Sequence, residues 1–173
     1  MSASVPYLGP QGAGGDVWGA ETAARGRRGT QRILHAGEVR ATADVAALLG
    51  VSEGDEVVVR RRIMFLDDEP WELTDTYYPA RIARGTGLAG TAKIRGGAVT
   101  LLAELGYVGV RAREEVAARM PTEEEAALLQ TVPDEPVLRL TRATLDAADA
   151  PIQADIMTMP AHRQRLRYEL RIG

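Results

Sequence analysis

The chain has 173 residues, of which 45% are hydrophobic, and this is enough for one globular domain with a sizeable core. Its formal net charge of -3 argues against a nucleic-acid-binding domain, because such domains concentrate basic side chains on one surface. The absence of cysteine excludes disulfides, thiolate metal sites and cysteine nucleophiles. No apolar run approaches the ~18 residues of a membrane span, and the first residues lack the basic start and apolar core of a signal peptide, so we expect a cytoplasmic protein without membrane contact.

The N-terminal segment, residues 1–29, predicts a flexible lead-in with one short helix. Its first half is rich in Gly, Pro and Ser and has no periodic apolar pattern. Asp16 is a candidate N-cap for a helix that runs to Arg25. The basic stretch RGRRGTQR then fits a solvated linker, with contact to a phosphate as the alternative. We place the folded domain in residues 30–173.

The first part of this domain predicts a strand, a helix and a β-hairpin. The strand begins at Thr30 and bends at Gly37. Thr42 caps the helix, and Gly50 ends it in a left-handed conformation. The hairpin is the stretch DEVVVRRRIMFLDDEPWELTDTYYP, residues 55–79, with its turn at DDEP.

The middle of the domain is less regular. Pro79 starts a short helical turn, and a glycine-punctuated loop, residues 85–97, leads into a helix that Gly106 closes. A strand is predicted from Tyr107 to about Met120.

The C-terminal part predicts one helix and three strands. Thr122 and Glu125 form a capping box at the start of the helix EEEAALLQ. The strands PVLRLTRATLD, PIQADIMTM and RLRYEL occupy residues 136–146, 151–159 and 165–170. Strands in adjacent hairpins with helices inserted between them predict an α+β domain, in which helices flank an antiparallel β-sheet.

Several familiar motifs fail on their context. The string GTGLAG, residues 85–90, matches a dinucleotide fingerprint, but a helical pattern precedes it and a loop follows it. The three serines lie in the lead-in or at a turn, so a serine hydrolase has no plausible nucleophile. His35 and His162 have no second ligand at metal-binding spacing. We therefore expect neither a metal nor a cofactor.

Three consecutive arginines in the hairpin are the strongest sign of a ligand site. Alternation places Arg60 and Arg62 on one face of the strand and Arg61 on the other. A guanidinium on a buried face needs an anionic or polar partner. Other polar residues interrupt apolar strands at Thr74, Thr76, Arg139, Arg142, Gln153 and Asp155. Two interpretations remain, a structural Arg-Asp network within the sheet or a site for a small anionic or polyhydroxyl ligand.

The order of these segments resembles the effector-binding domain of GntR-type transcription regulators, and more narrowly the UTRA domain of the HutC subfamily. The resemblance covers residues 29–170 and rests on LLGV, EVVVRRRIMF, DDEPWELTDTYYP, IRGGAVTLLAELGY, EEEAALLQ and RLRYEL. It implies a chorismate-lyase-like fold, a small-molecule effector, a homodimer and no enzymatic activity. In such regulators a winged helix-turn-helix module contacts DNA, and we expect DNA contact only through such a module outside this chain.

The resemblance also assigns effector contacts to particular residues. The first-strand arginine of the family falls on Arg62, and its second arginine is replaced by Met64. Two glutamates that hold sugar hydroxyls in amino-sugar-responsive members fall on Thr74 and Gln153, and a tyrosine falls on Met159. These departures imply a weakly anionic or partly apolar effector.

A helix start completes the expected effector site. The family holds an anion near a helix N-terminus that corresponds to Ala98, and Gly97 lets a ligand approach the backbone. Thr76 and Asp155, which interrupt neighbouring apolar strands, complete the set.

Three functions follow from these patterns. The leading one is a non-enzymatic sensor, in which the effector changes the geometry of a dimer. The second is a chorismate-lyase-like enzyme acting on a small carboxylate, disfavoured because Thr74 and Gln153 stand where a general acid is expected. The third is a structural dimerisation module whose pocket is filled by side chains.

Overall fold

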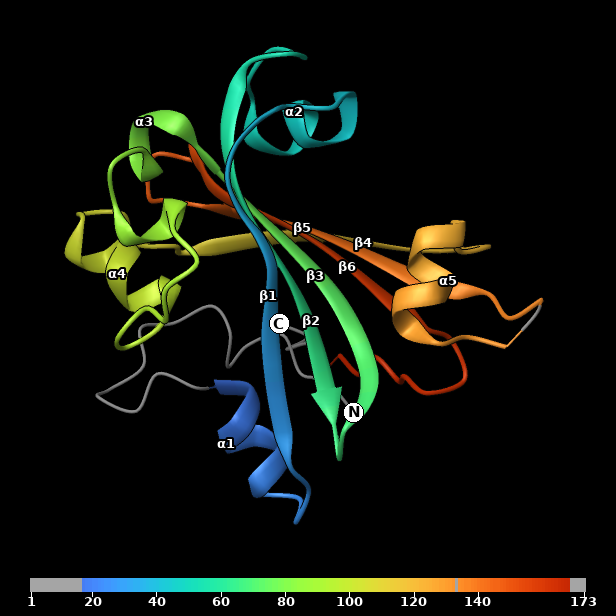
Figure 1. Cartoon of the computed structure of the whole chain (residues 1–173). Coiled ribbons are helices and arrows are strands. Elements are labelled where there is room, and N and C mark those ends of the chain that lie inside the picture. The colour runs from blue at the N-terminus through green and yellow to red at the C-terminus, as the bar shows by residue number, and fades with distance from the viewer. Residues whose placement is uncertain (1–16, 133, 169–173) are drawn as a thin grey trace, which may run out of the picture.

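The computed structural model describes residues 17–132 and 134–168, so the lead-in up to the proposed cap Asp16 lies outside the described residues. Six strands form one sheet in the order β1-β2-β3-β6-β5-β4, in which every neighbouring pair is antiparallel (Figure 1). The strands are β1 (Gly29–Arg40), β2 (Glu56–Leu66), β3 (Glu69–Pro79), β4 (Arg111–Arg119), β5 (Val137–Leu145) and β6 (Pro151–Pro160). The helices are α1 (Val17–Ala23), α2 (Ala43–Leu49), α3 (Ala80–Ala83), the short 3-10 helix η2 (Gly87–Ala89), α4 (Ala98–Glu104) and α5 (Glu123–Leu129). The predicted α+β architecture is confirmed.

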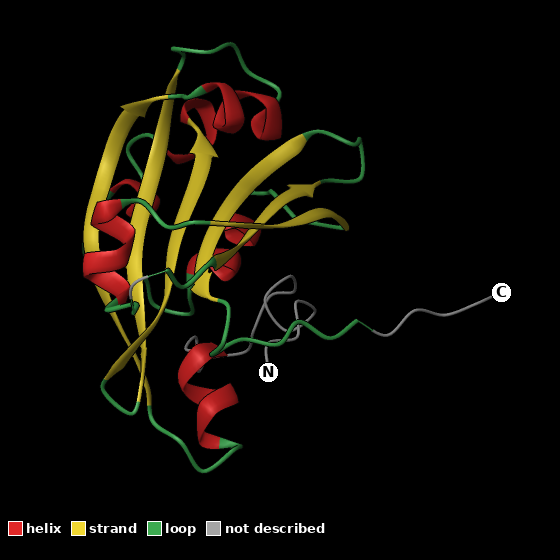
Figure 2. Ribbon diagram, turned by 90° about the vertical axis from the view of Figure 1, so that its right-hand side faces the viewer, coloured by secondary structure: helices red, strands yellow, loops and turns green. Residues whose placement is uncertain are grey.

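Helices cover both faces of the sheet (Figure 1). One face carries α1, α3, η2 and α4, and we call it the α4 face; the other carries α2 and α5, and we call it the α5 face. The cluster under α3, η2 and α4 includes Val58, whereas the cluster under α2 includes Val57. The same alternation along β2 places Arg62 on the α4 face and Arg61 on the α5 face. Figure 2 shows how strongly the sheet twists between these layers.

Local sequence signals explain most element boundaries. The Thr42 hydroxyl accepts a hydrogen bond from the Val45 N–H, and Gly50 ends α2 with φ +64°. Asp67 and Asp68, with φ +50° and +68°, form the two-residue turn between β2 and β3. The capping box expected at the start of α5 is present, with both of its reciprocal hydrogen bonds.

Two strand predictions need correction in their details. The bend expected at Gly37 is instead a shift of the β1–β2 register between Ile33 and His35, and it turns Leu34 toward the cluster under α5. The strand expected from Tyr107 starts later, at β4, because the Tyr107 N–H donates to a carbonyl of α4 and closes that helix.

The strand expected at RLRYEL is also wrong where it can be assessed. Over residues 165–168 the only strand-like residue is the single bridge at Leu166, and residues 169–170 lie outside the described part. Within the described residues, no helix is long and apolar enough to span a bilayer.

The basic stretch after α1 is attached to the hairpin turn. Arg27 Nε donates to Asp67 Oδ2 at 2.7 Å, and Arg28 pairs with Asp68. Trp18 of α1 adds a hydrogen bond from Nε1 to the Phe65 carbonyl at 3.0 Å. The arginines are exposed, as a linker requires, but they and Trp18 fix α1 against the end of the β2–β3 hairpin.

Candidate functional site

A chain of hydrogen bonds joins three strands on the α4 face. Arg62 Nη2 donates to Thr76 Oγ1 at 3.0 Å, and that hydroxyl donates to Asp155 Oδ1 at 2.8 Å. Gln153 Nε2 donates to Asp155 Oδ2, also at 2.8 Å. The strand register explains why these side chains contact each other, since Thr76 lies directly opposite Asp155 and Arg62 lies opposite Thr74. Four residues expected at the site are therefore in one network.

Glu72 extends this network toward α1 and was not selected from the sequence. The Thr74 hydroxyl donates to Glu72 Oε1 at 2.6 Å. Burial raises the pKa of Glu72, and the charge of Asp155 raises it further, whereas the Thr74 hydroxyl and two guanidinium groups oppose the shift. Glu72 therefore adds a carboxylic acid with a raised pKa to a strand of the site. The alternation that placed Glu72 beside Thr74 was the available signal.

Arg142 and Glu114 form a buried ion pair at the other side of the network. Arg142 Nε donates to Glu114 Oε1 at 2.6 Å, and the two side chains are only 6% and 13% exposed. Arg142 lies opposite Asp155 in the β5–β6 register. Its charge also reaches Glu72, where it opposes the rise of the pKa. Arg142 therefore belongs to the site region, although its charge is already matched by Glu114.

The remaining charges of the network have no ionic partner. Among the ion pairs within the described residues, none involves Arg62, Glu72 or Asp155. Asp155 is only 4% exposed, and Arg62 Nε is buried without a hydrogen bond. We call this set the polar strip: Arg62, Glu72, Thr74, Thr76, Arg142, Gln153 and Asp155.

Two expected apolar contacts lie on the same strands as the polar strip. Met64 is 7% exposed and packs with Trp18, Leu66 and Trp71, so it joins the hairpin to α1. Met159 is 1% exposed and lies opposite Leu138 in the β5–β6 register. Both methionines are core residues in this structure, not freely accessible side chains.

Gly97 and Ala98 lie at the other end of the α4 face. Gly97 is the N-cap of α4 with φ +86°, and Ala98 packs against the cluster that contains Tyr78. Within the described residues no hydrogen bond or ion pair joins either residue to the polar strip. The structure therefore does not bring these two residues into the network.

Arg60 has a structural role beside the polar strip. Its Nη1 donates to the carbonyls of Gly87, at 3.1 Å, and Gly90, and its Nη2 donates to the Ala92 carbonyl at 3.2 Å. Burial lowers the pKa of Arg60, as expected for a guanidinium bound by carbonyl dipoles and not by a carboxylate. Arg60 thus holds the glycine-rich loop against the sheet.

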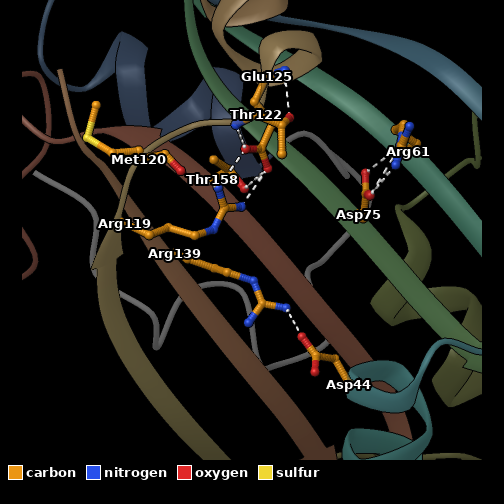
Figure 3. Close-up of polar contacts among 9 residues, drawn as sticks. All are labelled: Asp44, Arg61, Asp75, Arg119, Met120, Thr122, Glu125, Arg139 and Thr158. Atoms are coloured by element: carbon orange, nitrogen blue, oxygen red, sulfur yellow. Dashed lines mark hydrogen bonds and ion pairs between the residues drawn. The ribbon is translucent and has the colours of Figure 1, made fainter. Parts of the chain in front are cut away.

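The α5 face carries the structural Arg-Asp network that the sequence left as one interpretation (Figure 3). Arg61 Nε donates to both oxygens of Asp75 at 3.1 Å, and its Nη1 donates to Glu124 at 3.2 Å. Arg139 pairs with Asp44 of α2 at 2.8 Å. Arg61 is therefore part of a structural network that joins β2 to β3 and α5.

Over residues 17–132 and 134–168, no group of three or more His, Cys, Asp or Glu side chains is arranged to hold a metal ion. His162 contacts Glu135.

The fold is that of effector domains of bacterial regulators. The effector domain of PhnF from Mycobacterium smegmatis has a TM-score of 0.75 and 22% identity, with 95% of this chain and 99% of that chain covered. The C-terminal domain of the histidine utilization repressor from Pseudomonas syringae pv. tomato has a TM-score of 0.67 and 23% identity, with 84% of this chain and 100% of that chain covered. At these identities the likeness establishes the chorismate-lyase-like α+β fold.

The family follows from the sequence match. The family model of the UTRA domain matches residues 24–165. An uncharacterized HTH-type transcriptional regulator from Streptomyces coelicolor is 36% identical over 134 residues, which are 72% of this chain and 48% of that protein. The chain belongs to the UTRA domain family, the effector-binding domains of GntR-family regulators. It spans about half the length of the curated relative that it matches.

Proposed function

We propose that the domain binds its small-molecule effector on the polar strip and passes this event to a DNA-binding module of the same regulator. The observation that carries the proposal is a set of three charges, the buried Asp155 and the half-buried Arg62 and Glu72, none of which has an ionic partner in the described part of the chain. Burying such charges costs stability. Charges without an ionic partner, and groups with a raised pKa such as Glu72, concentrate at functional sites, where a ligand compensates them.

The proposed effector contacts are the nine residues selected from the sequence, now with Glu72 added. They are Arg62, Met64, Thr74, Thr76, Gly97, Ala98, Gln153, Asp155 and Met159. The hydrogen bonds within the strip support the polar members, whereas contact with Met64 or Met159 requires an effector that displaces a packed core side chain. Contact with Gly97 and Ala98 requires an effector that extends toward α4.

The proposal for signal transmission starts at Met64. This residue follows Arg62 on the same face of β2 and packs against Trp18 of α1, the first described element of the chain. An effector that displaces Met64 therefore changes how α1 sits on the hairpin. A ligand shifts such an equilibrium only through different affinity for the two arrangements.

We further propose that the chain forms a homodimer in the cytoplasm and that the full regulator contacts DNA through a winged helix-turn-helix module. The curated relative is named as an HTH-type regulator, and the match covers 48% of it, which leaves length for such a module. Sedimentation equilibrium tests the dimer. A mass of twice the 18.6 kDa of the chain is expected, and a mass of 18.6 kDa at all concentrations would refute it.

We propose that the domain is a sensor and not an enzyme. Because Glu72 is a carboxylic acid with a raised pKa, the chorismate-lyase-like alternative deserves a direct test. Incubation of the protein with chorismate should yield no more pyruvate than buffer alone. Pyruvate release that is lost in Glu72→Gln would establish the enzyme instead.

The site assignment is tested with a matched pair of arginine variants. Thermal-shift screening identifies a stabilising metabolite, and calorimetry then measures its Kd for the parent, Arg62→Ala and Arg139→Ala. Arg139 pairs with Asp44 on the opposite face, so its variant controls for the loss of a sheet arginine. We expect about a tenfold or larger loss of affinity for Arg62→Ala, since charge-assisted hydrogen bonds contribute about 1.5–3 kcal/mol. Equal affinity of Arg62→Ala and the parent would refute the site.

A further inference from the structure

The charges of the polar strip do not balance, and the imbalance is negative. Arg142 and Glu114 cancel each other as a buried pair. What remains is one guanidinium, Arg62, beside two carboxylates, Glu72 and Asp155. The Thr74 hydroxyl that binds Glu72 and the Thr76 hydroxyl that binds Asp155 lie two positions apart on the same face of β3, and the charge of Asp155 raises the pKa of Glu72.

The carboxylates are held by neutral donors that leave acceptor capacity unused. Glu72 accepts one hydrogen bond, from the Thr74 hydroxyl, and Asp155 accepts two, from Thr76 and Gln153. An ionised carboxylate offers about four acceptor positions. Within the described residues, both groups are therefore oriented but not saturated, which is the arrangement that favours a donor from outside the protein.

The cations that could receive an anionic ligand are engaged elsewhere. Arg60 binds three carbonyls of the glycine-rich loop, and Arg61 lies on the opposite face with Asp75. At the next α4-face position after Arg62, Met64 packs against α1. A phosphate or dicarboxylate would thus contact one guanidinium, that of Arg62, and would be repelled by the carboxylates of Glu72 and Asp155.

We propose that the effector carries an ammonium group, bound between Glu72 and Asp155, and a hydrogen-bond acceptor to which the Arg62 guanidinium donates. The ligand class is therefore a small amine or zwitterion and not the weakly anionic molecule expected from the sequence. This inference rests on the proposed function, because it assumes that the effector occupies the polar strip.

Three small isosteres test the charge preference without knowledge of the natural effector. Glycinamide is a cation, glycolamide is neutral and glycolate is an anion, and the first two differ only by an ammonium in place of a hydroxyl. Each is titrated into the full chain at about pH 6.5, where the ammonium is protonated. Amide chemical shifts of Thr74, Thr76 and Gln153 report binding, and inorganic phosphate is the fourth probe.

We expect glycinamide to shift these amides with a millimolar Kd, at least ~10-fold below that of glycolamide, because a charge-assisted contact replaces a neutral one. Glycolate and phosphate should bind more weakly still. In Glu72→Gln the preference for glycinamide over glycolamide should disappear, and Asp155→Asn provides the same test if that variant does not fold. Glu124→Gln, on the opposite face, is the matched control and should leave all four affinities unchanged.

The contrary outcomes separate the ligand class from the site. If glycolate or phosphate shifts the strip amides as strongly as glycinamide, the site stands and the ammonium class is wrong. If glycinamide binds but shifts only amides outside the polar strip, the site itself is wrong. Failure of all four probes to shift the strip amides at about 100 mM, well above the millimolar range expected for such small ligands, would also overturn the inference.

Discussion

The two faces of the sheet use their charged residues differently. On the α5 face the arginines are bound to carboxylates, in the pairs Arg61–Asp75, Arg139–Asp44 and Arg119–Glu125 (Figure 3). On the α4 face the Thr76 hydroxyl joins Arg62 to Asp155, the Thr74 hydroxyl donates to Glu72, and no ion pair within the described residues involves these three charges. Arg61 and Arg62 are adjacent in the chain, so a shift of one position separates a structural role from the ligand-binding role that we propose.

This difference separates stability from function within one sheet. The pairs on the α5 face satisfy each other and hold α2 and α5 in place. The unpaired charges on the α4 face cost stability until a ligand meets them, as is common at binding sites. Removing an unpaired charge on the α4 face should therefore stabilise the ligand-free protein, whereas breaking an ion pair on either face should destabilise it.

Arg142→Ala should have the largest effect, because it leaves Glu114 as a buried carboxylate without its cation. Breaking a buried pair by removing one partner costs about 3–5 kcal/mol. Urea denaturation measures the loss. Arg139→Ala, whose partner Asp44 is 65% exposed, should lose about 1 kcal/mol or less. Equal losses in the two variants would remove the distinction between a buried pair and an exposed one.

Thr122→Ala should destabilise the protein by about 1 kcal/mol, because it removes one half of the capping box of α5. Burial alone would raise the pKa of Glu125, but Arg119 and Thr122 lower it to about 2. The stabilisation by ionised Glu125 is therefore complete above pH 4.5, the ordinary pKa of this group, and is lost as the pH falls toward 2. Thermal unfolding of the parent and Glu125→Gln over this range measures it, and a pH-independent difference would contradict it.

Glu72→Gln should stabilise the ligand-free protein by about 1 kcal/mol at neutral pH, because the amide keeps the shape without the enclosed charge. The pKa of Glu72 is raised by burial and by Asp155, while Thr74, Arg62 and Arg142 oppose the shift. The stabilisation that protonated Glu72 contributes is thus fully present below pH 4.5, the ordinary pKa of this group, and is lost as the pH rises through the pKa of Glu72 in the folded protein. The gain of the variant should vanish in acid. Destabilisation at neutral pH would show that the charge is compensated.

Glu124→Gln should have the smallest effect, below about 0.5 kcal/mol, since its carboxylate is 68% exposed and only adds to the bond between Arg61 and Asp75. Thermal unfolding at two salt concentrations measures it. A larger loss that salt does not reduce would mean that the network on this face contributes more to stability than its exposure suggests.

Local patterns were sufficient to predict much of this fold. Alternation assigned Arg61 and Arg62 to opposite faces, and capping chemistry located the starts of α2 and α5 at Thr42 and Thr122. These features depend on residues within one strand or one turn. The family resemblance added the chorismate-lyase-like fold, which periodicity alone does not specify.

The contents of the site could not be derived in the same way. Thr76 meets Asp155 from 79 positions away, and Arg60 meets the loop carbonyls only after that loop has folded over the sheet. Glu72 lay in the correct alternation, but its raised pKa depends on neighbours from β2, β5 and β6. Long-range register and tertiary packing therefore decided which polar residues remained without a charged partner.

The pKa of the Glu72 side chain tests the contrast between the two faces most directly. A carboxyl carbon NMR titration of the ligand-free chain follows Glu72 and Glu125 in the same sample. Glu72 should titrate above 4.5, and Glu125 should titrate near 2. A Glu72 that titrates at or below 4.5 would mean that Arg62 and Arg142 already compensate its charge, and this would contradict the account of the α4 face as an unpaired, ligand-ready site.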